Sequence, residues 1–369
     1  MNENLLNIFK KYSTIILVGG WTGWHIQPIV SIVKNLKNTN TQLTWIGWNN
    51  SEEAKVAHNE NIPFLPIPIL KLSTTKSFKI LLYPIYLCIG FFRARGILKK
   101  YHSSDNNIAI FSKWWPGSIA IGIAGWSLGI PLYIHESDTI PGRSNRTLWR
   151  FAKKIFLGFE DAKKYFNTEK CEVVGQILDP VFDCHCEPAK QSRKITEQRQ
   201  SVDRFVPRDD ENKIHWKTSK PHILVICGSQ WAKSIFDAII KQFKDDTSYE
   251  WIVALWKLNT NMQYAFADIQ NCQAIPWISQ ENIAHLIQDT DVAISRWSAT
   301  TLAELTSSNK NIPKLIIIPL PYSAGNHQYY NAIEYEKIWH ILLEQENIKE
   351  LKNTINKLNS YARNWTENK

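Results

Sequence analysis

The stretch TIILVGGWTGWHIQP, residues 14–28, decides how the N-terminal half of this 369-residue chain folds. The apolar run from Thr14 to Val18 has the character of a buried strand and leads into a glycine-containing turn. Apolar residues then recur at helical spacing from residue 26 to residue 36. The pattern predicts a strand, a turn and a helix, and the backbone N–H groups at the start of such a helix commonly bind phosphate or sugar groups.

The turn contains Trp21 and Trp24 at positions where glycine is the usual residue. Glycine suits such turns because positive φ and close ligand approach are cheap only without a Cβ. The chain has 16 Trp and 15 Gly, and its glycine content of about 4% is below the average of about 7%. Nine tryptophans stand where the local context predicts glycine: Trp21, Trp24, Trp48, Trp114, Trp115, Trp231, Trp256, Trp297 and Trp339.

Composition places the chain among ordered globular proteins, with 44% apolar and 21% charged residues. The 43 Lys and Arg exceed the 34 Asp and Glu, so the net charge is +9. This charge suggests an anionic partner, such as a phosphorylated metabolite or an anionic membrane surface. Because the basic residues are spread along the chain, we do not expect nucleic acid as a partner. Residues 1–13 lack the apolar core of a signal peptide, so we expect none.

The cysteines predict reduced thiols rather than a metal site or disulfides. No C-x-x-C pair occurs among the six: Cys88, Cys171, Cys184, Cys186, Cys227 and Cys272. The fragment Cys184-His185-Cys186 resembles half of a metal site, but no second ligand pair follows at a suitable spacing. We therefore expect no metal in this protein.

Strand-like runs alternate with helical patterns in two series. The first series has strands near 14–18, 43–47, 108–111, 131–135 and 154–157. The second has strands near 222–230, 250–254, 274–278, 292–295 and 314–318, with helices near 232–243, 299–307, 327–337 and 348–364. Alternating β and α units form parallel sheets covered by helices, so we expect two doubly wound α/β domains with ligand bound between them. The polar stretch 183–220 separates the series as a linker or insertion.

Several motifs then carry a family resemblance. With Trp21 and Trp24 read as glycine, the opening becomes GGGTGGHIQP. Downstream follow, in order, SLGIPLYIHESDTIPGRSNR (127–146), GSQWAKS (228–234), ISRWSATTLAEL (294–305) and GNHQYYNA (325–332). The chain resembles the MurG family, the transferases that move N-acetylglucosamine (GlcNAc) from UDP-GlcNAc to lipid I to make lipid II in peptidoglycan synthesis.

The resemblance implies an inverting glycosyltransferase of the GT-B type, with two Rossmann-like domains facing a central cleft and no cofactor. It implies an acceptor- and membrane-facing domain over 1–179, a UDP-sugar domain over 180–349, and a final helix over 350–369 that packs back on the first domain. Two alternatives stay open. One is another nucleotide-sugar enzyme of this fold, such as a lipid glycosyltransferase or a UDP-GlcNAc epimerase, and the other is a non-catalytic sugar-binding paralogue.

The nine unusual tryptophans have an explanation in the genetic code. Some codes read UGA as glycine and others read it as tryptophan, so a gene of the first kind translated with the second code would give this pattern. The alternative is a degenerate paralogue, or a tryptophan-rich carbohydrate-binding surface, with genuine indoles in these turns. UGA codons at the nine positions support the first explanation, and UGG at most of them excludes it.

The resemblance also implies the site residues. His25 is the candidate base, because an imidazole with a pKa of about 6.5 suits proton transfer near neutrality, although it can instead cap the turn. Glu136 is the second candidate catalytic residue. The residues implied to bind UDP-GlcNAc are Thr22, Gly23, Trp24, Asp138, Ser229, Gln230, Ile278, Ala299, Thr300, Thr301, Leu302, Ala303, Glu304 and Gln328.

Within this set, Ser229 and Gln230 are implied to contact the diphosphate, and Glu304 the two ribose hydroxyls. Ile278 is implied to contact uracil through its backbone and Gln328 the sugar. Two positions depart from the family pattern: Asp138 stands where relatives often carry asparagine, and Asp179 stands where many carry arginine. Arg296 and Lys233 are the candidates to supply the missing cation.

Residues 76–100 predict attachment to a membrane surface. The uncharged core, Ile80–Phe92, has thirteen residues, whereas a membrane span needs about twenty. Basic residues flank it on both sides, so we expect peripheral docking on an anionic leaflet, at the cytoplasmic face of the plasma membrane. The alternative is a buried helix with solvated ends. The predicted patch comprises Lys79, Ile80, Leu81, Leu82, Phe91, Phe92 and Arg93.

Overall fold

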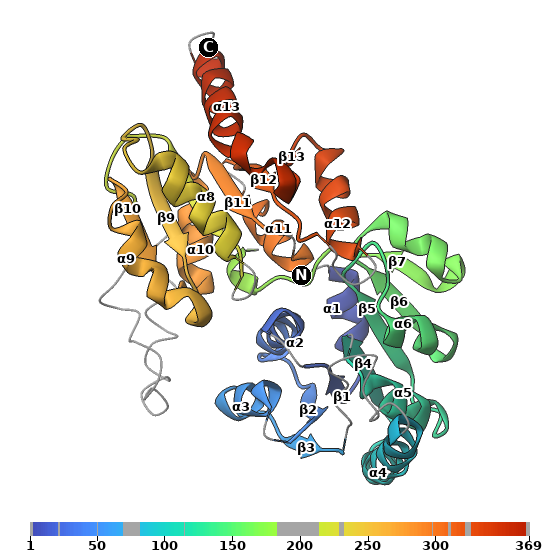
Figure 1. The fold of residues 1–369 in the computed structure, drawn as a ribbon. Coiled ribbons are helices and arrows are strands. Elements are labelled where there is room, and N and C mark those ends of the chain that lie inside the picture. The colour runs from blue at the N-terminus through green and yellow to red at the C-terminus, as the bar shows by residue number, and fades with distance from the viewer. Residues whose placement is uncertain are drawn as a thin grey trace. The chain divides into compact units, whose positions relative to one another are not determined.

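The computed structural model describes residues 3–20, 23–49, 51–68, 82–113, 115–182, 214–228, 232–296, 298–308, 311–321 and 326–366. It divides the chain into two compact units, Met1–Pro180 and Val181–Lys369 (Figure 1), and each unit has its own sheet. The division lies one residue beyond the expected boundary at 179. Most of the polar stretch 183–220 lies outside the described residues.

The N-terminal unit contains a seven-stranded parallel sheet in the order β3-β2-β1-β4-β5-β6-β7. The strands are β1 (Thr14–Val18), β2 (Gln42–Gly47), β3 (Phe64–Pro66), β4 (Ile108–Lys113), β5 (Leu132–Glu136), β6 (Lys154–Leu157) and β7 (Cys171–Val173). Every residue of β1, β4 and β5 is buried. Such continuous apolar runs are typical of parallel strands that are covered on both faces.

Helices cover both faces of this sheet (Figure 1). They are α1 (Glu3–Phe9), α2 (Gly23–Leu36), α3 (Glu52–Asn59), α4 (Tyr83–Ser104), α5 (Ser118–Trp126) and α6 (Arg143–Leu148). Alternate residues of β1 enter two separate cores, because successive side chains of a strand point to opposite faces. Ile15 and Leu17 pack with α1, α2 and α3, whereas Ile16 and Val18 pack with α4, α5 and α6.

The C-terminal unit contains a six-stranded parallel sheet in the order β10-β9-β8-β11-β12-β13. The strands are β8 (His222–Ile226), β9 (Glu250–Ala254), β10 (Cys272–Ile275), β11 (Val292–Ser295), β12 (Lys314–Ile317) and β13 (Ile341–Leu342). The helices are α8 (Lys233–Phe243), α9 (Gln263–Phe266), α10 (Gln280–Leu286), α11 (Ala299–Leu305), α12 (His327–Glu336) and α13 (Leu351–Thr366).

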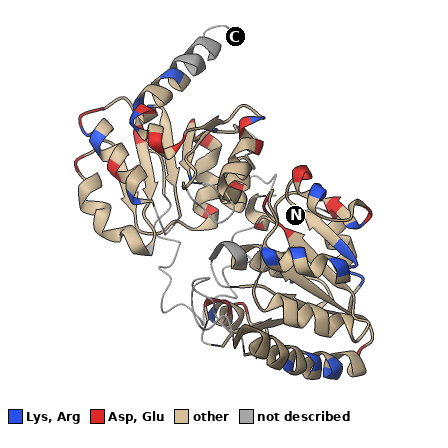
Figure 2. Cartoon of the chain, turned by 45° about the vertical axis from the view of Figure 1, so that its right-hand side comes forward, with Lys and Arg blue, Asp and Glu red and all other residues tan. Residues whose placement is uncertain are grey.

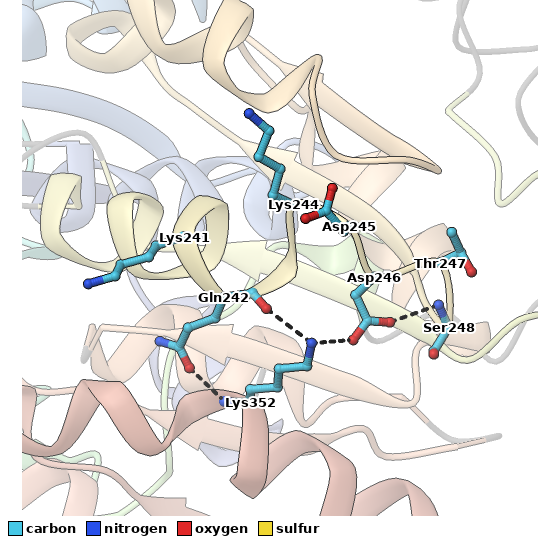
Figure 3. A pocket seen from close by; sticks show the side chains of 8 residues that line it. All are labelled: Lys241, Gln242, Lys244, Asp245, Asp246, Thr247, Ser248 and Lys352. Atoms are coloured by element: carbon cyan, nitrogen blue, oxygen red, sulfur yellow. Dashed lines mark hydrogen bonds and ion pairs between the residues drawn. The ribbon is translucent and has the colours of Figure 1, made fainter.

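The start of helix α13 packs within this second unit, and the expectation that the C-terminal helix packs back on the first domain stays a prediction. Leu351 and Ile355 enter the core beside α8. Lys352 donates from Nζ to the carbonyl oxygen of Gln242 (3.1 Å) and to Asp246 (2.8 Å), and these residues line a polar hollow of about 330 Å³ (Figure 3). The core and the polar contacts therefore attach the start of α13 to α8.

Two of the nine unusual tryptophans have a backbone conformation typical of glycine. Trp256 has φ 59° and ψ 165°, a region populated essentially by glycine alone. Trp339 follows α12 with φ 75°. Its N–H donates to the carbonyl of Glu336 (3.1 Å), and the N–H of His340 donates to that of Tyr335 (3.2 Å). These two bonds form a Schellman motif in which Trp339 occupies the position that is usually glycine.

Candidate functional site

The turn after β1 has no room for side chains at its first two positions. A Cβ on Gly19 would lie 2.5 Å from Cδ1 of Ile29 and 2.8 Å from the carbonyl oxygen of Lys113. A Cβ on Gly20 would lie 2.5 Å from the carboxyl carbon of Glu53, a side chain that is buried behind the turn. Gly19 therefore requires glycine, because the backbone of Lys113 blocks a Cβ, whereas a side chain at position 20 would have to displace the Glu53 carboxylate.

Helix α2 begins at Gly23, so His25 lies in its first turn, where the sequence places it. Trp21 and Thr22 lie outside the described residues, as do the side chains of Trp24 and His25. The base role of His25 and the ligand contacts of this turn stay predictions.

Glu136 ends β5, and its carboxylate is bound by its own loop. Oε1 accepts the N–H of Asp138 (3.0 Å), and Oε2 accepts the N–H of Gly142 (3.0 Å) and Nδ2 of Asn145 (2.9 Å). Burial raises the pKa of Glu136 to about 7, and the charge of Asp138 raises it as well. The hydrogen bonds from Asp138 N–H and Asn145 and the charge of Lys113 act in the opposite direction. The buried carboxylate therefore holds loop 137–142 through these hydrogen bonds, and the catalytic role of Glu136 stays a prediction.

Two ionisable residues beside this loop were not singled out by the sequence. Lys113 ends β4, is buried, and places its Nζ 2.9 Å from Nδ1 of His135. Burial lowers the pKa of Lys113 to about 8, against the opposing effect of the Glu136 and Asp138 charges. The sequence feature that could have indicated Lys113 is its position as the single charged residue, at the end of the strand IAIFSK.

In the C-terminal unit, α11 carries most of the residues implied to bind UDP. Ser298 caps this helix by accepting the N–H of Thr301. The helix residues are buried except for the half-buried Ala303: Ala299, Thr300, Thr301, Leu302 and Glu304. Oγ1 of Thr301 is buried and has no hydrogen-bond partner in the described part of the chain. Buried hydroxyls are normally paired, so this atom is suited to a ligand.

The other predicted ligand residues of this unit are partly described. Gln328 on α12 is buried, and its Oε1 accepts the N–H of Leu320 (2.8 Å), which orders the segment after β12. The side chain of Ile278 is buried, which fits a ligand contact through its backbone. Ser229 and Gln230 lie outside the described residues.

Asp179, a departure from the family pattern, is buried and paired. Its Oδ2 lies 2.5 Å from Nζ of Lys34, and Nε2 of Gln27 donates to it at 3.5 Å. Both partners belong to α2, the helix that begins at the glycine turn. The ion pair therefore ties the end of the first unit to that helix.

Of the two candidates to replace the missing arginine, Arg296 is engaged elsewhere. Its guanidinium donates to Oε1 of Gln345 (2.6 Å), Oγ of Ser234 (2.7 Å) and the carbonyl oxygen of Ile318 (3.4 Å). This buried side chain therefore holds three segments of the second unit together. Lys233, exposed at the start of α8, is the better candidate.

Comparison with known proteins assigns the family. A model described as the glycosyltransferase family 28 N-terminal domain matches residues 15–157, and one described as its C-terminal domain matches residues 222–369. A relative from Sulfurihydrogenibium sp. is 28% identical over 86% of this chain and 81% of its own length. It is named UDP-N-acetylglucosamine--N-acetylmuramyl-(pentapeptide) pyrophosphoryl-undecaprenol N-acetylglucosamine transferase. The chain belongs to the MurG family.

Solved structures confirm the GT-B fold. The crystal structure of MurG from Acinetobacter baumannii matches with a TM-score of 0.67 and 21% identity, covering 93% of this chain and 90% of that one. The UDP-GlcNAc 2-epimerase from Neisseria meningitidis matches with a TM-score of 0.58 and 13% identity, covering 94% and 92%. At such identities the likeness concerns the fold alone.

In this member of the MurG family, α4 presents two contrasting faces. Gly90, Ala94 and Leu98, spaced four residues apart, are buried, and the last two enter the core. A second stripe at helical spacing is exposed and apolar: Leu82 (46% exposed), Ile85 (55%), Ile89 (48%) and Phe92 (70%). Such a stripe on one helix is typical of an interaction surface.

The predicted membrane patch coincides only in part with this stripe. Leu82, Phe92 and Arg93 are exposed, whereas Phe91 is half-buried against the core. Lys79, Ile80 and Leu81 lie outside the described residues. Figure 2 shows basic residues along α4, which contains no acidic residue. Within the part of the chain that the structure describes, every helix is too short or too polar to cross a membrane.

Proposed function

We propose that this chain transfers GlcNAc from UDP-GlcNAc to the C4 hydroxyl of MurNAc in lipid I, giving lipid II. The observation that carries the proposal is the match to relatives named as this transferase over most of both chains, through both domains of the family. Two features support it: the glycine turn at the start of α2, and the buried hydroxyl of Thr301 on α11, which has no hydrogen-bond partner among the described residues.

In the proposed reaction the acceptor oxygen bonds to the anomeric carbon while the bond from that carbon to UDP breaks. Attack from the face opposite UDP inverts the anomeric centre. The acceptor hydroxyl must lose its proton, and His25 in the first turn of α2 is the proposed base. Glu304 is proposed to accept the ribose hydroxyls, since a carboxylate offers two acceptor oxygens. Lys233 is proposed to offset the charge of the departing diphosphate.

We also propose that α4 docks the protein on an anionic membrane surface. The exposed apolar stripe of Leu82, Ile85, Ile89 and Phe92 provides the area to insert. Cations on the same helix provide attraction to acidic headgroups: Arg93, Arg95, Lys99 and Lys100. Docking would bring the enzyme to an acceptor whose lipid tail stays in the bilayer.

The test compares two forms of the protein, which we call the tryptophan chain (the printed sequence) and the glycine chain (glycine at all nine unusual positions). Each is incubated with labelled UDP-GlcNAc and a lipid I analogue, and the lipid-linked disaccharide is extracted. We expect acceptor-dependent transfer by the glycine chain. We expect little or none by the tryptophan chain, because Trp21 and Trp24 stand where the family pattern has glycine, and close ligand approach is cheap only without a Cβ.

Failure of both chains to form the disaccharide would overturn the proposal. Conversion of UDP-GlcNAc to its epimer without acceptor would favour the epimerase alternative. Tight UDP-GlcNAc binding by the tryptophan chain, with no turnover by either form, would favour a sugar-binding paralogue. The tryptophan-to-glycine substitutions described below are made in the tryptophan chain, and the other variants are made in whichever form transfers GlcNAc.

A further inference from the structure

A network of buried polar groups contacts the segment Glu136–Asp138, and the proposed reaction does not use this network. Lys113 at the end of β4 contacts both Nδ1 of His135 (2.9 Å) and Oγ of Ser137. Lys113 and His135 are almost completely buried, with 2% and 0% of their surface exposed. Burying an ammonium group costs free energy unless its donors are satisfied. We therefore expect a function for the buried Lys113.

The contacts of His135 fix which of its nitrogens carries the proton. Nε2 lies 3.0 Å from the carbonyl oxygen of Gly175, just after β7. A carbonyl only accepts, so Nε2 carries hydrogen and Nδ1 accepts from the Lys113 ammonium. Burial and the Lys113 charge both hold the pKa of His135 well below its usual value, so the ring is neutral. The donor direction therefore runs from Lys113 through His135 to Gly175.

Ser137 is held from two sides. Its Oγ accepts from Lys113, and its carbonyl oxygen accepts from Nε2 of Gln176 at 2.8 Å. The packing around this contact is tight, because a Cβ on Gly158 would lie 2.1 Å from that same Nε2. Ser137 lies between Glu136 and Asp138, so fixing it orients both neighbours.

We propose that Lys113 is a positioning residue for glycosyl transfer, whose ammonium holds Ser137 and so orients Asp138, one of the residues implied to bind UDP-GlcNAc. Asp138 is the half-buried end of this arrangement, whereas Lys113 is buried beneath it. The inference rests on the proposed function, because the family resemblance that implies GlcNAc transfer also implies that Asp138 binds the sugar nucleotide. It goes beyond that function by naming the group that keeps Asp138 in place.

Protonation of Lys113 connects this role to pH. Burial lowers the pKa of Lys113 to about 8, and the groups that face it are His135, Glu136 and Asp138. His135 is neutral at the pH of interest, and the two carboxylates favour the ammonium. The neutral amine loses its attraction to both carboxylates, so transfer should decline as pH rises through about 8.

The experiment compares Lys113→Met and Ser137→Ala with Lys163→Met, a control lysine in a surface ion pair. We expect at least a tenfold fall in kcat/KM for the lipid I analogue in the first two, with UDP affinity within about twofold of the parent. Lys113→Met should also lose the alkaline decline near pH 8, whereas the control should keep it. Circular dichroism and UDP binding show whether each variant is folded.

Equal kcat/KM and an unchanged pH profile in folded Lys113→Met would overturn the inference while leaving the proposed function standing. A fall in activity that matches the loss of folded protein, with the alkaline decline kept, would also overturn it. If the parent transfers no sugar, the proposed function fails, and the role in transfer fails with it. In that case ¹⁵N NMR of His135 still detects the loss of the Nδ1 hydrogen bond in Lys113→Met, which separates the observed contact from its function.

Discussion

Trp256 and Trp339 are the residues at which the backbone itself supports the hypothesis that UGA codons for glycine were translated as tryptophan. Among the described non-glycine residues with positive φ, the other three are asparagines: Asn61, Asn271 and Asn326. Asparagine tolerates this conformation and tryptophan does not. Trp48 and Trp115 lack positive φ, and Trp115 is buried in the core of the first unit, so the hypothesis rests there on the sequence alone.

We predict that Trp256→Gly and Trp339→Gly each raise the free energy of unfolding of the C-terminal unit. Relief of a strained position is worth about 1–3 kcal/mol. The control is Trp251→Gly in the same unit, which removes a fully buried indole from β9 and should lower the free energy of unfolding by about 3–5 kcal/mol. Urea unfolding measures all three, and destabilisation by the first two substitutions would contradict the strain argument.

Glu304 carries the residue-scale prediction for the nucleotide. Glu304→Gln should weaken UDP binding by about tenfold to a hundredfold, because a hydrogen bond to a charged group contributes about 1.5–3 kcal/mol. Glu281→Gln on the neighbouring α10, an exposed carboxylate, is the matched control and should bind UDP like the parent. Isothermal calorimetry decides, and unchanged affinity in Glu304→Gln would remove Glu304 from the nucleoside site.

At the scale of one element, β4 ends in a buried cation whose pKa makes stability depend on pH. Lys113 has a pKa of 10.5 in the unfolded chain and about 8 in the folded one. Between these values the unfolded state binds more protons, so the free energy of unfolding rises with pH across this window. The pKa difference corresponds to about 3 kcal/mol. Lys113→Met should lack this rise, and the difference between parent and variant in urea titrations from pH 7.5 to 10.5 measures it.

Helix α4 carries the prediction about membranes. Replacing Arg93, Lys99 and Lys100 with glutamine should weaken binding to vesicles containing acidic lipid by about 1 kcal/mol per cation. The matched control replaces Lys163 and Lys164 with glutamine, because these lysines lie near surface carboxylates on another element. Co-sedimentation with vesicles measures both. Equal loss of binding per removed cation in the two variants would mean that net charge alone, and not α4, attracts the protein to the membrane.

Element by element, the sequence predicted long buried strands and missed short ones. The strands β1, β6, β9 and β11 match their expected ranges, because uninterrupted apolar runs carry a strong signal. The edge strands β3, β7 and β13 have only two or three residues, which is too few for a pattern. The contacts between Lys113 and His135 could not be predicted either, because their alignment depends on the register of β4 and β5.

At the scale of the whole molecule, two βα series predicted two doubly wound units, and the structure has both. Periodicity shows which face of a helix is apolar and not which domain covers it, so the partner of α13 was not determined by the sequence. The same limit applies to residues 214–221. Their attachment to the second unit depends on Glu250, a buried carboxylate that accepts the N–H groups of Lys217 and Thr218.

These observations predict that residues 214–369 of the glycine chain fold alone and bind UDP. Among the described residues, the core beside α8 and α13 is built from residues 223–358, and the residues implied to contact the nucleoside lie in the same unit. We therefore expect one cooperative unfolding transition and a UDP affinity within about tenfold of the whole chain, a difference of about 1.4 kcal/mol. Residues 3–182 should not bind UDP, and Glu304→Gln in the isolated unit should weaken binding as it does in the whole chain. If the isolated unit folds but binds no UDP while the whole chain binds it, the first unit must contribute to the nucleoside site. The assignment of UDP binding to the second domain alone, which the family resemblance implies, would then be wrong for this chain.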